Sequence, residues 1–181
     1  MGGALEVLNA AGCALVGGTA IAGYFAAHLR SDDMDLFTRD AGAQTATVKA
    51  CQSLTKLGAE LAENQRTPDY YKATCTFEGH VFTIDVVLDA HLHQVGRLTR
   101  LENGVVVADL QTLFKMKAST LIGRCGEKDL YDIKWMLGAM KDITINDLLK
   151  WAHEMDAGAT ADSLYNVVGG TILDKKACDF S

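Results

Sequence analysis

Proline is almost absent from this 181-residue sequence, in which Pro68 is the one example. The sequence also has no proline-rich stretch, low-complexity tract or internal repeat, which excludes a visible linker and a repeat architecture. No apolar run reaches the ~18 residues that a membrane-spanning helix needs, and residues 1–6 lack the basic start of a signal peptide. We therefore expect a cytoplasmic protein that has no contact with a membrane.

Cysteines are few and widely spaced: five occur, and none forms a C-x-x-C pair. This spacing argues against a zinc site, and an odd number without a secretion signal indicates free thiols in a reducing compartment. Positive charge is also in deficit, because the formal net charge is −6. Proteins that bind nucleic acid mainly through its phosphates are usually basic, so a large nucleic-acid footprint is disfavoured. One local basic stretch remains, formed by Lys115, Lys117, Arg124 and Lys128.

The pattern of apolar and polar residues predicts an α+β fold, in which a mixed β-sheet flanked by helices precedes a helical C-terminal third. Short apolar or alternating runs, with turn residues at 78–79 and 102–104, predict strands over 13–16, 34–38, 70–77, 80–88, 97–101 and 105–107. Helical periodicity predicts helices over 4–11, 20–29, 44–63, 110–123, 128–140, 145–156 and 161–173. We expect a core over 1–108 and a helical part over 109–181 that packs on it as a single compact unit.

Local signals refine this outline at two helix starts. Thr19 follows two glycines and is placed to cap the helix over 20–29. Thr144, with Asp147 three residues later, resembles a capping arrangement. In the C-terminal part, the simplest interpretation of the large apolar side chains is a helical core that includes Leu130, Ile133, Trp135 and Met136.

Two aspartates, Asp33 and Asp35, are the first residues that suggest chemistry. Residues i and i+2 of a strand point to the same face, so both carboxylates would project together. Each then disfavours ionisation of the other, and a divalent cation relieves this repulsion. Mg²⁺ is commonly held by one or two carboxylates together with substrate phosphates. The alternative is that both aspartates are solvated loop residues, since charged side chains are seldom buried.

A third aspartate, Asp85, lies in the otherwise apolar strand over 82–88. A carboxylate in such a run is costly unless it is paired or bound to a metal. Its two interpretations are therefore a metal ligand and the partner of a core lysine or arginine. Three carboxylates on adjacent strands can hold two cations ~4 Å apart, which activate the attacking oxygen and stabilise the leaving oxygen in phosphoryl-type displacements.

A glycine turn, Gly17-Gly18-Thr19, follows one strand and opens a helix. Glycine lets the backbone approach a phosphate closely, the helix N-terminus offers free N–H groups, and Thr19 adds a hydroxyl. The same residues also suit an ordinary corner between a strand and a helix. The turn lacks the G-K-[ST] ending of a Walker A motif, so a P-loop is not supported.

Two blocks of residues resemble one family. The first block reads approximately G-G-T-A, a helix, then H-R-x-S-x-D-x-D-L-F in that family, and the second reads K-(x)6-R-(x)3-K-D-x-x-D. The sequence is similar to the AbiEii/AbiGii-type nucleotidyltransferases, a branch of the DNA polymerase β-like superfamily that includes bacterial toxins, over roughly residues 13–137. Leu29 departs from the family arginine, and Arg30 follows one position later. The matching residues are Gly17, Gly18, Thr19, Ala20, His28, Ser31, Asp33, Asp35, Leu36, Phe37, Lys117, Arg124, Lys128, Asp129 and Asp132.

The resemblance implies a role for each matched residue. Asp33, Asp35 and Asp85 would bind Mg²⁺ or Mn²⁺, and Asp85 would help to activate the acceptor hydroxyl. Lys117, together with Arg124, would neutralise phosphate charge. The other nucleotide-binding residues would be Gly17, Gly18, Thr19, Ser31, Lys128, Asp129 and Asp132, of which the last two could instead orient a lysine. From its chemistry alone, the second block is equally a solvated helix pair with surface ion pairs.

The function that the resemblance implies is transfer of a nucleoside monophosphate from an NTP to a hydroxyl acceptor. RNA and protein acceptors are favoured, in a toxin-like role with a neighbouring antitoxin protein, and a small molecule such as an aminoglycoside also fits the chemistry. The alternative is a non-catalytic module of the same fold that binds a nucleotide or a partner.

Overall fold

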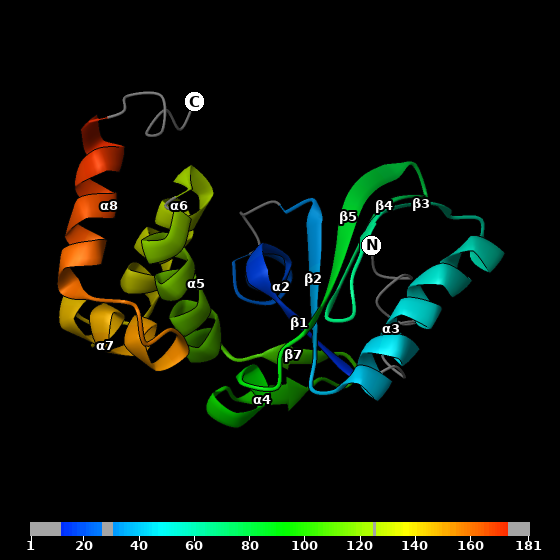
Figure 1. Ribbon diagram of the computed structural model, residues 1–181, viewed down its shortest axis with the longest axis horizontal. Helices are drawn as coiled ribbons and strands as arrows, with labels where there is room; N and C mark the ends of the chain where they lie inside the picture. Colours follow the sequence, from blue (N-terminus) through cyan, green and yellow to red (C-terminus); the bar gives the residue numbers. More distant parts are fainter. Residues whose placement is uncertain (1–11, 27–30, 125, 174–181) are drawn as a thin grey trace. The chain divides into compact units, whose positions relative to one another are not determined.

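A mixed seven-stranded sheet forms the first part of the chain, and the predicted α+β class is confirmed (Figure 1). The computed structural model describes residues 12–26, 31–124 and 126–173, so the helix predicted over 4–11 lies outside the described residues. The strands are β1 (Cys13–Val16), β2 (Asp33–Thr38), β3 (Glu60–Arg66), β4 (Tyr70–Phe77), β5 (His80–Leu88), β6 (Leu98–Arg100) and β7 (Val106–Ala108). Their order in the sheet is β3-β4-β5-β2-β1-β7-β6.

Both predicted hairpins are confirmed, since β4 pairs with β5 and β6 pairs with β7 in antiparallel fashion. The turn between β4 and β5 places Glu78 and Gly79 in the left-handed region, with φ of 52° and 77°. Two pairings are parallel instead, β2 with β5 and β1 with β7. The parallel pairing brings the strand that carries Asp33 and Asp35 next to the strand that carries Asp85.

The helices are α2 (Gly17–Tyr24), α3 (Ala41–Ser53), η2 (Leu54–Leu57), α4 (Leu92–Val95), α5 (Leu110–Arg124), α6 (Glu127–Ala139), α7 (Ile145–Met155) and α8 (Ala161–Leu173). The chain divides into two compact units, Met1–Asp109 and Leu110–Ser181. The first unit holds the sheet with α2, α3 and α4, and the second unit is helical. In the described residues, no helix has the length and apolar character needed to cross a membrane.

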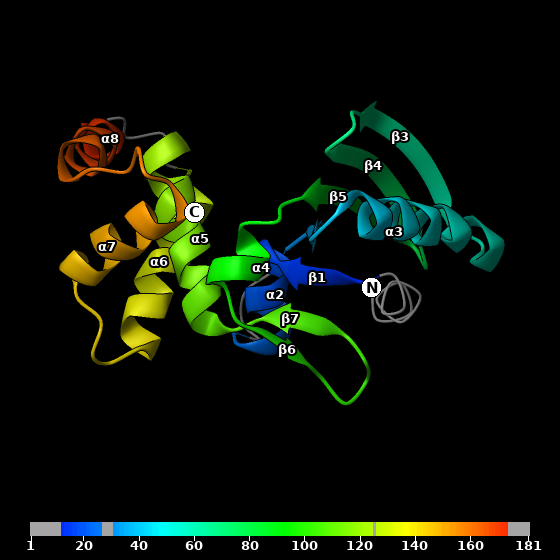
Figure 2. The ribbon, with the colours of Figure 1, turned by 60° about the horizontal axis from the view of Figure 1, so that its bottom comes forward.

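The two faces of the sheet differ in polarity because side chains alternate along each strand. In Figures 1 and 2, α3 lies along one face of the sheet, while α2 lies on the other side of β1 and β2. The face toward α3 is apolar, and on β4 it carries the buried residues Tyr71, Ala73, Cys75 and Phe77. The opposite face of β4 carries the half-buried residues Tyr70, Lys72, Thr74 and Thr76.

The helix predicted over 44–63 is wrong in its last part. The helix α3 begins after Asp40, whose side chain accepts a hydrogen bond from Ala43 N at 2.8 Å, and it ends at Ser53. A short 3₁₀ turn follows, and Gly58, with φ of 92°, ends it in the left-handed conformation that glycine adopts most readily. Residues 60–63 then belong to β3, an edge strand that pairs only with β4.

The start of α2 also differs from the prediction. Its N-cap is Val16 and no side chain caps it, so Thr19 lies inside the first turn and is not the capping residue. The helix ends at Tyr24, and residues 27–30 of the predicted helix lie outside the described residues. Glycine at residue 17 allows this early start, because this residue has φ of 68°.

The helices of the second unit lie within about one residue of the predicted bounds. Thr144 and Asp147 form a complete capping box, which confirms the predicted cap of α7. An edge-to-face contact between Phe114 and Trp151, with ring centroids 5.4 Å apart, joins α5 to α7. Ile133 and Met136 are buried as predicted.

Candidate active site

Three aspartates lie on one face of two neighbouring strands. Asp33 and Asp35 are two residues apart on β2, so they share the face opposite the buried residue Met34. In the parallel register of β2 and β5, Asp35 is the direct partner of Asp85, and Asp33 is the partner of Thr83. The sheet therefore places all three carboxylates on the side away from α3.

The glycine turn lies directly against this acidic group. A Cβ atom at residue 17 would be 1.9 Å from Asp35 Oδ2, far inside any allowed contact. Because β1 pairs with β2 so that Val16 is opposite Asp35, the start of α2 is brought over the carboxylate. Glycine at residue 17 is thus required both by its positive φ and by the side chain of Asp35.

Thr19 also joins α2 to β2, through a side-chain hydrogen bond. Its hydroxyl donates a hydrogen bond to the backbone carbonyl of Asp33, and its side chain is buried. This bond fixes the first turn of α2 to the first residue of β2. The hydroxyl is therefore committed to the backbone here, and its predicted contact with a triphosphate stays a prediction, as do the roles of Gly18 and Ser31.

Asp85 is held by two side chains of β4 that the sequence analysis did not single out. The hydroxyl of Tyr70 donates a hydrogen bond to Asp85 Oδ1. Lys72 Nζ lies 3.3 Å from Oδ1 and 3.3 Å from Oδ2 of the same carboxylate. The ion pair that was one of two interpretations of Asp85 is present, although Lys72 comes from the exposed side of the sheet, with 38% of its side chain exposed.

Thr83 lies between two of the carboxylates. Its hydroxyl is 2.7 Å from Asp33 Oδ1 and 3.3 Å from Asp85 Oδ2. One hydroxyl carries one proton, so the shorter contact to Asp33 is the hydrogen bond. Thr83 thereby connects the carboxylate of β2 to the carboxylate of β5.

The position of Lys72 opposite Asp85 could have been predicted from the sequence. The two-residue turn at Glu78-Gly79 fixes the register of the hairpin, because it sets Phe77 opposite His80. Each further step along β4 then matches one step along β5, which sets Lys72 opposite Asp85. The same register sets Thr74 opposite Thr83 and completes a polar surface on this face of the sheet.

The neighbourhood of Asp85 is electrostatically negative. Burial, the hydrogen bond to Asp85 and the charges of Asp85 and Asp35 together raise the pKa of Tyr70 to about 12. The phenol therefore stays protonated at neutral pH and remains a hydrogen-bond donor. The charges of Asp85 on β5 and Asp35 on β2 therefore both act on the phenol of Tyr70.

The donor chemistry of these side chains and the sheet face that they share suit a divalent cation. Carboxylate oxygens are the ligands that Mg²⁺ and Mn²⁺ prefer, and Asp33, Asp35 and Asp85 present them on one face of adjacent strands. As the side chains stand, Asp33 is turned to Thr83, and Asp85 to Tyr70 and Lys72. Across the described part of the chain, no three His, Cys, Asp or Glu side chains are gathered closely enough to hold one ion.

In the second unit, Lys117 forms a buried cluster with two aspartates. Its Nζ donates a hydrogen bond to Asp129 Oδ1 at 2.9 Å and forms an ion pair with Asp132 Oδ2 at 2.8 Å. Burial lowers the pKa of Lys117, but the hydrogen bonds and charges of Asp132 and Asp129 outweigh it and raise the pKa above its usual value. The cluster ties α5 to α6, and these ion pairs are buried, not on the surface.

Two further basic residues of this region were predicted to bind phosphate. Lys128 is exposed on α6, and the side chain of Arg124 lies outside the described residues. Two carboxylates surround the single ammonium of Lys117, so the cluster as a whole does not offer excess positive charge. Binding of phosphate by Lys117, Arg124 or Lys128 stays a prediction, as does contact of Asp129 or Asp132 with a nucleotide.

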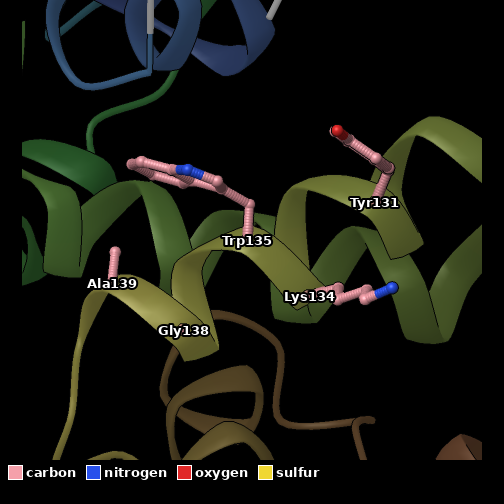
Figure 3. Close-up of a pocket in the computed structure, with 5 residues that line it drawn as sticks. All are labelled: Tyr131, Lys134, Trp135, Gly138 and Ala139. Carbon is pink, nitrogen blue, oxygen red and sulfur yellow. The ribbon is translucent and has the colours of Figure 1, made fainter. Parts of the chain in front are cut away.

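A hollow of about 410 Å³ lies along one side of α6, lined by Tyr131, Lys134, Trp135, Gly138 and Ala139 (Figure 3). The two small residues leave the space beside the indole ring of Trp135. Trp135 is half-buried, so its assignment to the helical core is only partly right. It shares α6 with the buried residues Ile133 and Met136 but belongs to a different face. None of the residues that were predicted to carry chemistry lines this hollow.

Comparison with known proteins identifies solved structures that have a similar fold. No protein-family model and no curated protein matches this chain. Among solved structures, a candidate nucleotidyltransferase from H. pylori has 14% identity and a TM-score of 0.56, over 98% of this chain and 83% of that chain. The nucleotidyltransferase toxin MenT4 from Mycobacterium tuberculosis has 14% identity and a TM-score of 0.50, over 96% of this chain and 64% of that chain.

A third similar structure is the Megavirus polyadenylate synthase, with 11% identity and a TM-score of 0.51. The match covers 75% of this chain but only 30% of the viral protein, so the chain spans less than a third of that enzyme's length. The chain therefore has the nucleotidyltransferase fold, as its sequence predicts. Membership of the AbiEii/AbiGii-type branch stays a prediction.

Proposed function

We propose that this protein is a metal-dependent nucleotidyltransferase that moves a nucleoside monophosphate from an NTP to a hydroxyl acceptor. The observation that carries the proposal is the arrangement of Asp33, Asp35 and Asp85 beside Gly17. Two carboxylates share one face of β2, the third is the register partner of Asp35, and the helix start lies against Asp35. Negative side chains and a helix N-terminus at one place suit a triphosphate that arrives with its cations.

The proposed reaction is a displacement at the α-phosphorus. The acceptor hydroxyl oxygen forms a bond to this phosphorus, the bond to the bridging oxygen of the β-phosphate breaks, and pyrophosphate leaves. The hydroxyl proton is transferred to a base, and Asp85 is the carboxylate proposed for this role. A divalent cation would be held by Asp33 and Asp35 with Asp85, and when bound it neutralises phosphate charge during such a displacement.

RNA or protein is the proposed acceptor, in a toxin-like role that a partner antitoxin protein would restrain. The likeness in fold to a nucleotidyltransferase toxin and to a polyadenylate synthase supports this direction. The net charge of −6 supports a short contact with any nucleic acid over a long one. Lys117, Arg124 and Lys128 are proposed to neutralise phosphate charge, and Asp129 and Asp132 to position Lys117.

One observation favours the second candidate, a non-catalytic module that binds a nucleotide or a partner. Lys72 already neutralises Asp85 within the protein, as a purely structural ion pair would. This candidate predicts that the protein binds NTP but never turns it over.

A label-transfer assay tests the proposal. Purified protein is incubated with each of the four NTPs carrying an α-phosphate label, with Mg²⁺, and with total RNA, total protein or a small-molecule extract. We expect label on one acceptor class, and loss of that label in the Asp33→Ala variant. NTP binding without transfer to any acceptor would favour the non-catalytic module, and transfer by Asp33→Ala would remove the metal assignment.

A further inference from the structure

Both carboxylate oxygens of Asp85 face the ammonium of Lys72. Lys72 Nζ is 3.3 Å from each of the two carboxylate oxygens, so the ammonium faces both oxygens equally. Tyr70 and Thr83 contact one oxygen each, Oδ1 and Oδ2 respectively. A carboxylate can bind a metal ion through one oxygen or through both, and the position that faces both oxygens of Asp85 is taken by Lys72.

The ion pair between Lys72 and Asp85 is longer and more exposed than the ion pairs of Lys117. Charge-assisted hydrogen bonds of this kind are usually 2.7–2.9 Å long, and Lys117 meets that range with contacts of 2.9 Å and 2.8 Å. Only 10% of the Lys117 side chain is exposed, whereas 38% of the Lys72 side chain is exposed. Lys72 can therefore leave Asp85 for solvent at small cost, while Lys117 is fixed.

Lys72 also comes from a strand that does not carry the other two carboxylates. It projects from β4, on the far side of β5 from β2, and reaches Asp85 across the β4–β5 pairing. A cation bound between Asp33, Asp35 and Asp85 would approach Asp85 from β2. An ammonium and a divalent cation on the same carboxylate repel each other, so cation binding favours release of Lys72.

We propose that Lys72 is the built-in counter-ion of Asp85 in the cation-free protein and competes with the divalent cation for this carboxylate. The inference rests on the proposed function, because it assumes that Asp85 belongs to a cation site. Its consequence is an order of events. A cation can meet Asp33 and Asp35 first, and Asp85 joins only after Lys72 has left, so the lysine weakens cation binding in the absence of substrate.

Cation binding without any nucleotide tests this competition. Mn²⁺ is titrated into the protein, and free Mn²⁺ is measured by electron paramagnetic resonance for wild type, Lys72→Met and Lys72→Arg. An exposed ion pair worth up to ~1 kcal/mol corresponds to at most about a fivefold change in affinity, so Lys72→Met should bind Mn²⁺ more tightly, by up to about fivefold. Lys72→Arg keeps the positive charge and should stay close to wild type.

Two controls separate competition from a general change of charge. Lys49, an exposed residue of α3, lies on the helix that covers the other face of the sheet. The Lys49→Met variant should therefore leave Mn²⁺ affinity within about twofold, because distant surface charges are screened by salt. In an Asp85→Asn background, Lys72→Met should give no gain, because the contested carboxylate is gone.

Unchanged or weaker Mn²⁺ binding by Lys72→Met would overturn the inference. If Lys72→Met does not fold by circular dichroism, Lys72→Gln removes the charge while keeping a polar side chain, and the same outcomes apply. Failure of the proposed function gives a different pattern. In that case neither wild type nor Lys72→Met binds Mn²⁺ and no label is transferred, whereas failure of the inference alone leaves wild-type binding and transfer intact.

Discussion

The carboxylate of Asp35 occupies the space into which a side chain at residue 17 would project. Gly17 has φ of 68°, and a Cβ atom there would lie 1.9 Å from Asp35 Oδ2. The glycine turn and the acidic strand, which are 18 residues apart in the sequence, are therefore one structural feature. An ordinary corner between a strand and a helix would not require a carboxylate at this position, so the contact links the turn to the proposed chemistry.

Replacing Gly17 by alanine should displace Asp35 and remove nucleotidyl transfer. Gly58 provides a matched control, because it also has a positive φ, 92°, but a Cβ atom there meets nothing within 4 Å. Both variants carry the cost of a left-handed alanine, roughly 1–2 kcal/mol. Only Gly17→Ala should lose transfer, as measured by the α-label assay on protein that is folded by circular dichroism. Equal activity of the two variants would show that the position of Asp35 does not matter.

The hydroxyl of Thr83 should matter for cation binding because it lies between Asp33 and Asp85. The isosteric change Thr83→Val removes the hydrogen bond that positions the carboxylate of Asp33 beside Thr83. We expect weaker Mn²⁺ binding in a titration followed by electron paramagnetic resonance. Thr74→Val is the control, since Thr74 is the register partner of Thr83 on the same face but donates to Asn64. A loss of affinity of the same size in both variants would argue against a specific role for Thr83.

Lys117 should contribute strongly to stability, whatever its role toward phosphate. Its removal in Lys117→Met leaves Asp129 and Asp132 buried without their cation, which typically costs about 3–5 kcal/mol. Lys115→Met is the comparison, because the Lys115–Glu154 pair is partly exposed and such pairs are worth ~0–1 kcal/mol. Urea unfolding of both variants measures the difference in unfolding free energy.

The direction of the Lys117 pKa shift determines the pH at which urea unfolding should show the full effect. The folded-state pKa of Lys117 is raised above its unfolded-state value, which is about 10.4. The stabilisation is therefore fully present below about pH 10 and is lost as the pH rises through the folded-state pKa. Unfolding at pH 7 should show the whole effect, and a Lys117→Met variant as stable as Lys115→Met would contradict the buried cluster.

The thiol of Cys51 should resist alkylation in the folded protein. Burial, and then the neighbouring thiols of Cys13 and Cys75, raise its pKa to about 12. The reactive thiolate is therefore scarce at pH 8, and all three residues are buried. Iodoacetamide at pH 8, followed by peptide mass spectrometry, should modify these three cysteines only after unfolding. Rapid modification of Cys51 in the native protein would show that the apolar face under α3 is open.

Much of the first unit follows from local sequence, because period-two alternation identifies β2, β4 and β5 and puts Asp33 and Asp35 on one face. The edge strand β3 escapes this reasoning for a physical reason. Nearly all of its side chains are exposed, so it has no apolar alternation, while Leu57 and Leu61 continue the helical spacing of α3. The left-handed Gly58 marks the end of the short 3₁₀ turn that follows α3.

Some contacts of the candidate site could be predicted from local sequence, and others depend on how distant segments pack. The pairing of Lys72 with Asp85 follows from hairpin register and was within reach of the sequence. The contact between Gly17 and Asp35 was not, because it depends on how β1 pairs with β2 and on where α2 begins. The second carboxylate contact of Lys117 likewise needs the packing of α5 against α6, although the spacing of Asp129 and Asp132 indicated that they share a face.

We propose that Asp33, Asp35 and Asp85 together catalyse transfer of a nucleoside monophosphate. The most direct test uses one NTP labelled either at the α-phosphate or at the γ-phosphate, with wild-type protein and the Asp35→Asn variant. We expect wild type to transfer only the α-label to the acceptor and to release labelled pyrophosphate from the γ-labelled NTP, and we expect Asp35→Asn to do neither. Transfer of the γ-label, or transfer of the α-label by Asp35→Asn at the wild-type rate, would contradict this proposal.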